Sequence, residues 1–379
     1  MEELRQKKKE LKKLRKELHR KGLKNKEWFI TMREHNRVKE REAVIRNCQQ
    51  QKQFKKNPMR FGRELFQKKV SGDPTFSSQV ALDYFSKIYH DEKRETPFTP
   101  LPEMKRPPPP VHLLSEEPPS QAEIMTVLRL KRNGAAPGPN GISYVPYKKC
   151  PAVWPFMHKI FSKVWETRDV PSSWAFASIL LLPKSDKTSD PAEFRPIALT
   201  NTMGKIFFSV NKFTSHAQKG FKTNTPGCLE HSFAMFEALR DAKQNQRQVV
   251  VTWLDLCNAY GSVKHNLVQF ALQWYHVPAS FSNLIVEYYD KICACIRTKN
   301  WSSAAFLFDL GLFQGCVLSC VLFSCVFQLL LDMLAPLAEQ NGYHFKDSPI
   351  VLHDQAFADD LSILSSCPQL SQITIDAVH

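Results

Sequence analysis

Apolar residues follow two different patterns along the chain. Short apolar runs bounded by turn residues are typical of strands, and longer stretches with apolar positions three or four apart are typical of helices. The expected strands are Ile179–Lys184, Glu193–Leu199, the run from Val249 that ends at Asp255, Ile350–Leu352 and Leu361–Leu364. The pattern therefore predicts a mixed chain of helices and short strands.

Two helices are marked clearly. Ser120 with Glu123 forms a capping box, and Ile124, Val127 and Leu128 supply the buried face of a helix that Asn133-Gly134 ends. Further on, 310–331 is a stretch of 22 residues without a charge, long enough to span a bilayer. It contains glycines and glutamines and lies between two aspartates, which favours a buried helix over a membrane span.

Charge is distributed unevenly. Residues 1–60 hold 21 lysines and arginines against eight glutamates, whereas the remaining chain holds 31 basic against 29 acidic residues. The first sixty residues also have few helix breakers, so they predict a basic helical arm. Such an arm suits a polyanionic partner, DNA or RNA, although a solvated helix or short coiled coil has the same composition. No apolar segment near Met1 resembles a secretory signal.

Proline content divides the rest. Residues 97–119 hold nine of the 25 prolines and predict a stiff connector. Residues 61–96 predict short helices that dock on the main body, and the main domain is expected to be 120–379. The ten cysteines form no C-x-x-C pair, which argues against zinc and against a secreted disulfide framework.

Three aspartates are the candidates for chemistry. Asp359 and Asp360 are adjacent between two apolar runs, which would place them at the tip of a hairpin, and Asp255 ends a run that reads as a buried strand. Mg²⁺ prefers oxygen ligands and usually takes one or two carboxylates plus phosphate oxygens, so the three acids suit nucleotidyl transfer. Adjacent acids in a turn are also common without any such role.

The order of short motifs resembles the reverse transcriptases of non-LTR retrotransposons, nearest to the site-specific group. The motifs are Ala135–Ile142, Ile179–Lys184, Glu193–Leu199, Asp255 with Tyr260, Gln314-Gly315 and Ala358-Asp359-Asp360. The resemblance implies an α+β right-hand polymerase with fingers and an antiparallel palm sheet packed by helices, preceded by the basic arm.

By the same resemblance each motif residue has an expected role in RNA-directed DNA polymerisation. Asp255, Asp359 and Asp360 would hold two Mg²⁺ ions, and Tyr260 would exclude a 2′-hydroxyl from the incoming sugar. Gln314 and Gly315 would contact the forming base pair, and Lys184 and Arg195 the triphosphate, as their charge suits. The expected partners are an RNA template, a DNA primer or target and deoxynucleoside triphosphates, with no membrane, in the nucleus.

Some positions differ from the family. Gly261 stands where an aspartate is frequent, Phe357 replaces a tyrosine, and Cys316, Val317 and Cys320 replace residues around the Gln-Gly motif; the segment 205–220 looks short. Because 19 residues follow Asp360, a thumb is expected to be missing and primer extension to be weak. The alternative function is a truncated or domesticated remnant that binds nucleic acid without polymerising, and a more distant one is a group II intron maturase or telomerase-like relative.

Overall fold

The computed structural model describes residues 74–102, 104–110, 116–185, 188–210 and 228–378, and separate positions between residues 6 and 38. Contacts divide the chain into two compact units, Met1–Ser71 and Gly72–His379. The described positions of the first unit are helical. Most of the predicted arm, and residues 61–73 and 211–227, lie outside the described residues, so the arm stays a prediction.

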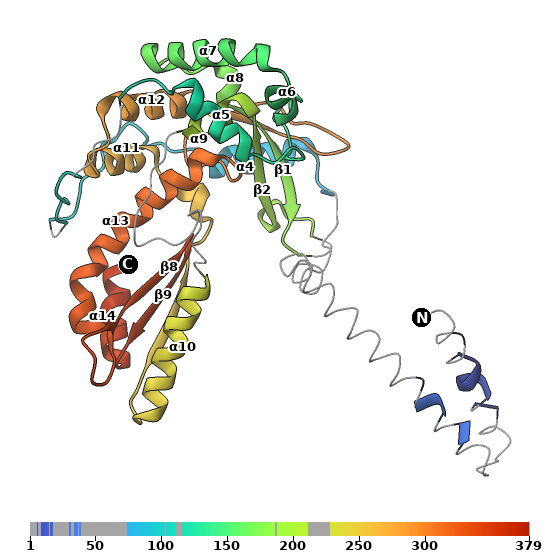
Figure 1. Ribbon diagram of the computed structural model, residues 1–379, viewed down its shortest axis with the longest axis vertical. Coiled ribbons are helices and arrows are strands. Elements are labelled where there is room, and N and C mark those ends of the chain that lie inside the picture. The colour runs from blue at the N-terminus through green and yellow to red at the C-terminus, as the bar shows by residue number, and fades with distance from the viewer. Residues whose placement is uncertain are drawn as a thin grey trace. The chain divides into compact units, whose positions relative to one another are not determined.

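The second unit contains a four-stranded sheet in the order β2-β1-β4-β5. β1 (Phe176–Pro183) and β2 (Phe194–Thr200) form an antiparallel pair, as their apolar runs predict. β4 (Cys293–Ile296) lies parallel to β1, and β5 (Phe306–Leu307) is the edge strand. Figure 1 shows this sheet among the helices α4 (Ser78–Ile88), α5 (Gln121–Leu130), α6 (Tyr144–Lys149), α7 (Trp154–Thr167), α8 (Ser172–Ala175) and α9 (Thr202–Val210).

The helix predicted after Ser120 is α5. Its capping box is formed, and Ile124, Val127 and Leu128 are buried as predicted. The helix ends at Leu130 and not at Asn133-Gly134, because the backbone of Lys131 is extended (φ −73°, ψ 144°). The Lys131 ammonium donates to the Ser209 hydroxyl of α9 at 2.8 Å, which holds this end of α5 against its neighbour.

A second, three-stranded antiparallel sheet has the order β3-β9-β8. β3 (Val250–Asp255) and β8 (Asp354–Phe357) flank β9 (Asp360–Ser365). α10 (Cys228–Gln244) packs near one face through small residues, and α14 (Pro368–Val378) contacts β9 and β3. In Figure 1 the strands β8 and β9 lie between α10 and the pair α13 (Val317–Asn341) and α14.

Two strand predictions are wrong in detail. The run before Asp255 is an edge strand and not a buried one: its residues are half-buried or exposed, and Trp253 is 70% exposed. The fully covered strand is the central β9. Val351–Leu352 is β7, which pairs with β6 (Tyr343–His344). The strand directly before the acids is β8. Its sequence is partly polar, so the pattern of apolar runs did not predict it.

The uncharged stretch is helical only in part: residues 310–316 are not helical, and α13 begins at Val317 and continues through Pro336. Within the part of the chain that the structure describes, it is the helix long and apolar enough to cross a membrane, and half of its most apolar stretch is buried. It contacts α11 (His265–Trp274), α14 and α9. These contacts fit the predicted core helix.

The main hydrophobic core joins both sheets. It includes Ala81, Phe85 and Tyr89 from α4 and the residue that follows it. Tyr89 stacks on Phe308 with 3.9 Å between ring centroids, beside β5. The segment from residue 74 therefore shares its core with the domain whose predicted start is residue 120.

Candidate functional site

The β3–β9 ladder brings two of the three aspartates together. Asp255, the last residue of β3, is the register partner of Asp360, the first residue of β9. Phe357 pairs with Asp360 from the other side, so Ala358 and Asp359 form the two-residue turn of the hairpin. Ala358 has a φ of +58°, as a tight hairpin turn requires. The hairpin tip predicted for the acids is present, with β8 as its first strand.

The acids influence one another electrostatically. Partial burial, followed by the negative charges of Asp359 and Asp255, raises the pKa of Asp360. Within the described residues no three His, Cys, Asp or Glu side chains are placed so that together they could hold a metal ion. Mg²⁺ usually takes one or two carboxylates and completes its shell with water and substrate phosphates, so a pair of acids is a donor set that it accepts. Asp255 and Asp360 are such a pair by their register.

Tyr260 lies next to the acids in the short 3₁₀ helix η3 (Ala259–Ser262). Its ring stacks on Phe323 of α13, with 4.7 Å between centroids and 9° between planes, and the residue is 8% exposed. Burial, then the Cys320 thiol and the Asp359 carboxylate, raises the pKa of Tyr260 far above its ordinary value. The phenol is therefore neutral, and the negative charge at the hairpin turn disfavours its ionisation.

Gln314 and Gly315 form the turn that precedes α13. The Gln314 carbonyl accepts the Ala198 amide of β2 at 2.7 Å, which joins this turn to the first sheet. Gly315 has a φ of +104°, and a β-carbon there would lie 2.9 Å from the Ala198 carbonyl oxygen. The Gln314 side-chain oxygen is buried without a hydrogen-bond partner in the structure. The motif is thus a tight junction between β2 of the first sheet and the start of α13.

Lys184 and Arg195 lie at the loop end of the β1–β2 hairpin. Arg195 pairs with Leu182 in the ladder, and the Lys184 amide donates to the Glu193 carbonyl at 2.8 Å. The Lys184 ammonium donates to the Ala192 carbonyl at 2.9 Å. Both side chains are exposed. The structure gives no contact between these cations and the three aspartates within the described residues.

Two features beside the site are not predicted by the sequence. Trp253 lies two residues before Asp255 on the same strand face, and its exposure has no signal in an apolar run. The loop 135–142 packs on the end of β2: a β-carbon at Gly138 would lie 2.4 Å from the Thr200 carbonyl, and the Asn140 amide donates to the Asn201 side chain at 3.2 Å. In the sequence, the Pro-Gly-Pro stretch is what indicates this loop.

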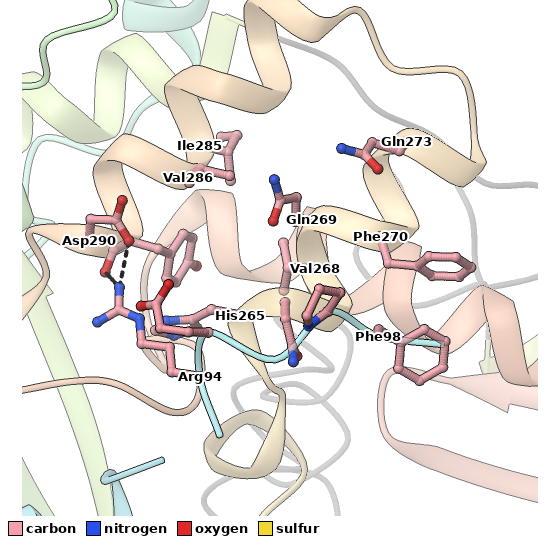
Figure 2. Close-up of a pocket in the computed structure, with 14 residues that line it drawn as sticks. Arg94, Phe98, His265, Val268, Gln269, Phe270, Gln273, Ile285, Val286 and Asp290 are labelled. Atoms are coloured by element: carbon pink, nitrogen blue, oxygen red, sulfur yellow. Dashed lines mark hydrogen bonds and ion pairs between the residues drawn. The ribbon is translucent and has the colours of Figure 1, made fainter. Parts of the chain in front are cut away.

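A cavity of about 740 Å³ lies elsewhere, between α11, α12 (Ala279–Asp290) and the segment from Arg94 to Phe98 (Figure 2). None of the candidate site residues lines it. It therefore belongs to a different part of the molecule than the acids.

Comparisons with known proteins identify the family. The family described as reverse transcriptase (RNA-dependent DNA polymerase) matches residues 182–378. The "Retrovirus-related Pol polyprotein from type-2 retrotransposable element R2DM" of Drosophila melanogaster is 25% identical over 249 residues, 64% of this chain and 23% of the relative. The corresponding type-1 element R2 polyprotein of Nasonia vitripennis is 25% identical over 271 residues, 69% of this chain and 25% of the relative.

Among solved structures, apo telomerase from Candida tropicalis, truncated from its C-terminal domain, is 13% identical with a TM-score of 0.37. The match covers 58% of this chain and 51% of that one. The chain spans about a quarter of the length of the two retrotransposon relatives. The family match covers more than half of the chain and includes every candidate site residue from Lys184 to Asp360. The chain therefore belongs to the reverse transcriptase family and carries a reverse transcriptase domain of the non-LTR retrotransposon type.

Proposed function

We propose that this domain is an RNA-directed DNA polymerase that adds deoxynucleotides to a primer 3′ end by two-metal nucleotidyl transfer. The observation that carries the proposal is the register of Asp255 opposite Asp360, with Asp359 in the adjoining turn. Partial burial, and after it the charges of Asp359 and Asp255, raises the pKa of Asp360, so the ionised carboxylates at this end of the sheet repel one another. Divalent cations bound between the carboxylates would offset this repulsion by electrostatic attraction, and such an arrangement therefore favours a metal-dependent function.

Asp255, Asp359 and Asp360 are the residues that would hold Mg²⁺. When bound, the two ions supply activation of the primer hydroxyl and neutralisation of charge on the leaving pyrophosphate. The protein's own contribution is to fix two carboxylates on hydrogen-bonded strands and the third in the adjoining turn, so that they do not have to be ordered during the reaction.

The remaining candidate residues surround the incoming nucleotide in this proposal. Lys184 and Arg195 are exposed cations on one hairpin and would neutralise the triphosphate on the side away from the acids. Gln314, at the junction of β2 and α13, would contact the forming base pair, and the Tyr260 ring would lie against the sugar. These roles follow the family pattern, and the junction between Gln314 and Ala198 supports them.

The partners proposed for this reaction are an RNA template, a DNA primer or target and deoxynucleoside triphosphates. A reaction on genomic DNA places the protein in the nucleus. The second candidate, a remnant that binds nucleic acid without polymerising, does not require Asp255 and Asp360 to be register partners. Their pairing therefore favours the polymerase.

The test uses the full chain with an oligo(dT) primer on a poly(rA) template, dTTP and Mg²⁺. We expect dTTP binding that depends on Mg²⁺ and incorporation that stops with a chelator and in Asp359→Ala. Asp376→Asn, an exposed acid on α14, is the matched control and should leave both unchanged. Absence of Mg²⁺-dependent dTTP binding, or incorporation that survives Asp359→Ala, would overturn the assignment.

A further inference from the structure

Residues 309–314 form a strip of chain, and its backbone hydrogen bonds connect it to the Tyr260 turn and to β2. The amides of Asp309 and Leu310 both donate to the Tyr89 carbonyl at 3.0 Å. Further along, the Gly311 amide donates to the Val263 carbonyl at 2.9 Å and the Leu312 amide to the Tyr260 carbonyl at 2.7 Å, which joins the strip to the turn that follows Asp255. The Gln314 carbonyl accepts from the Ala198 amide at 2.7 Å, which joins the strip to the first sheet. Any displacement of the strip therefore moves the Tyr260 turn and the Gln314 turn relative to each other.

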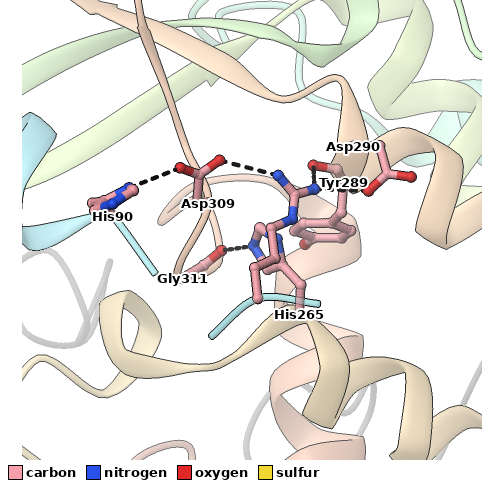
Figure 3. Close-up of polar contacts among 7 residues, drawn as sticks. His90, His265, Tyr289, Asp290, Asp309 and Gly311 are labelled. Carbon is pink, nitrogen blue, oxygen red and sulfur yellow. Dashed lines mark hydrogen bonds and ion pairs between the residues drawn. The ribbon is translucent and has the colours of Figure 1, made fainter. Parts of the chain in front are cut away.

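In addition to the backbone bonds to Tyr89, the Asp309 side chain at the beginning of the strip is held by the guanidinium of Arg94. Arg94 donates through Nη1 to Asp309 Oδ1 at 3.0 Å, and through Nη2 to Asp290 Oδ1 at 2.7 Å and to the Tyr289 carbonyl at 3.0 Å. His90 approaches the other oxygen of Asp309 at 3.2 Å. Figure 3 shows Asp309 with His90 on one side and Tyr289 and Asp290, at the end of α12, on the other. One planar fork thus joins the strip to α12.

The two ion pairs of Arg94 differ in strength. The side chains of Arg94 and Asp309 are 20% and 18% exposed, whereas Asp290 is 56% exposed. Water screens the exposed pair much more than the partly buried one. If Arg94 is removed, Asp309 keeps a partly buried charge without its guanidinium partner, which is costly. The Asp309 pair is therefore the contact that matters, and the Asp290 pair provides an internal comparison.

We propose that Arg94 is a positioning residue of the polymerase site, which acts through Asp309 to fix the Gln314–Gly315 turn against the Tyr260 turn. This inference rests on the proposed function for the role of Gln314. Arg94 lies outside residues 182–378, the part that matches the family. The segment before the matched region then supplies a component of the site and is not a separate docking element.

A lysine at position 94 keeps the charge but has no fork, so it cannot reproduce both sets of contacts. The side chain also borders the 740 Å³ cavity together with Phe98, His265 and Asp290 (Figure 2). Because there is space beside it, Arg94→Lys creates no overpacking. It therefore tests hydrogen-bond geometry separately from charge and volume.

Hydrogen exchange measured on the full chain tests the inference without requiring activity. We expect the peptide covering 309–316 to exchange roughly tenfold faster in Arg94→Ala and Asp309→Asn, because a lost charge-assisted contact lowers the local opening free energy. Arg94→Lys should fall between, and Asp290→Asn should match the wild type. A purely structural role would instead accelerate exchange in the β1–β2 hairpin by the same factor, and that result would overturn the proposal.

Nucleotide addition supplies the second readout. A shifted Gln314 turn should raise the KM for dTTP several-fold in Arg94→Ala and Asp309→Asn with a smaller change in kcat, while Asp290→Asn leaves both unchanged. Equal loss in all three variants would also overturn the proposal. If the wild type adds no nucleotide, the proposed function fails, and the exchange experiment still decides whether Arg94 positions the strip.

Discussion

Asp255 and Asp360 face each other as the last pair of the β3–β9 register, which begins with Val250 opposite Ser365. The pair is fixed by four intervening partners on each strand. A slip of one residue would turn every side chain of β9 to the other face, and its buried residues Leu361 to Ser365 prevent such a slip. The packing of β9 is therefore what places the two carboxylates together.

The first prediction concerns Mg²⁺ and Asp360. Because the folded-state pKa of Asp360 is raised, its charged form costs stability as the pH rises through that pKa. We expect Asp360→Asn to be more thermally stable than the wild type at pH 7 without Mg²⁺. With Mg²⁺ at ten times its Kd the wild type should gain about 1.4 kcal/mol, and the variant less. Thermal unfolding with and without Mg²⁺ measures both effects.

The control for this experiment is Asp376→Asn, which removes an exposed acid of α14 outside the hairpin. Its gain from Mg²⁺ should equal that of the wild type. An equal gain in Asp360→Asn would show that the ion is held elsewhere.

A second prediction concerns the backbone at Gly315. Alanine there must adopt a φ near +104° and approach the Ala198 carbonyl at 2.9 Å, so we expect a loss of about 1–3 kcal/mol in the free energy of unfolding. A β-carbon at Gly134 would meet no atom within 4 Å, so Gly134→Ala should be nearly neutral. Urea unfolding compares the two variants. Equal stabilities would mean that the Gln314 turn can relax.

Much of the site is predictable because its signals are local. A strand that ends in Asp255, an Asp-Asp pair in a turn and a Gln-Gly pair before an apolar helix are all short stretches of sequence. The structure places each of them in the expected kind of element, and the roles of the residues stay predictions. Phe357, which replaces a tyrosine, still pairs with Asp360 in the hairpin.

What could not be predicted depends on distant contacts. Arg94 and Asp309 are separated by 215 positions, and neither has a pattern that would reveal the pair. β8 has no clear signal because its partly polar sequence is stabilised by β9 and not by its own apolar residues.

The third prediction concerns pH. Burial lowers the pKa of His265 to about 4, against the opposing effect of its hydrogen bond to the Gly311 carbonyl. Below about pH 6.5 the His265 imidazole is therefore protonated in the unfolded chain but stays neutral in the folded chain. The free energy of unfolding falls as the pH falls towards 4. We expect His265→Gln to lose less unfolding free energy than the wild type between pH 7 and pH 5. Urea unfolding at several pH values measures the difference, and parallel curves would contradict it.

The fourth prediction tests the basic arm. Deleting residues 1–56 should weaken binding to duplex DNA and flatten its dependence on salt, because each lost phosphate contact lowers the slope of log K against log[salt] by roughly 0.9. Fluorescence anisotropy at several salt concentrations gives the slope. If deletion leaves the slope unchanged, the arm contacts protein instead.

The last prediction concerns the choice of sugar. Tyr260 is neutral, stacked on Phe323 and 8% exposed, so only a small part of the ring is available to a nucleotide. The influence of Asp359 on its hydroxyl places it close to the hairpin turn. A rigid ring edge at this place would clash with the 2′-hydroxyl of a ribonucleotide. Removing one small group from the wall of a fitted pocket changes the discrimination between two substrates by about 10- to 200-fold. We therefore expect Tyr260→Ala to incorporate ribonucleotides that the wild type rejects, whereas Tyr260→Phe, which keeps the ring, retains the preference for deoxynucleotides. Single-nucleotide addition with dTTP and UTP in competition measures the ratio, and thermal unfolding confirms that the variants are folded. An unchanged ratio in folded Tyr260→Ala would assign the ring to packing against Phe323 alone.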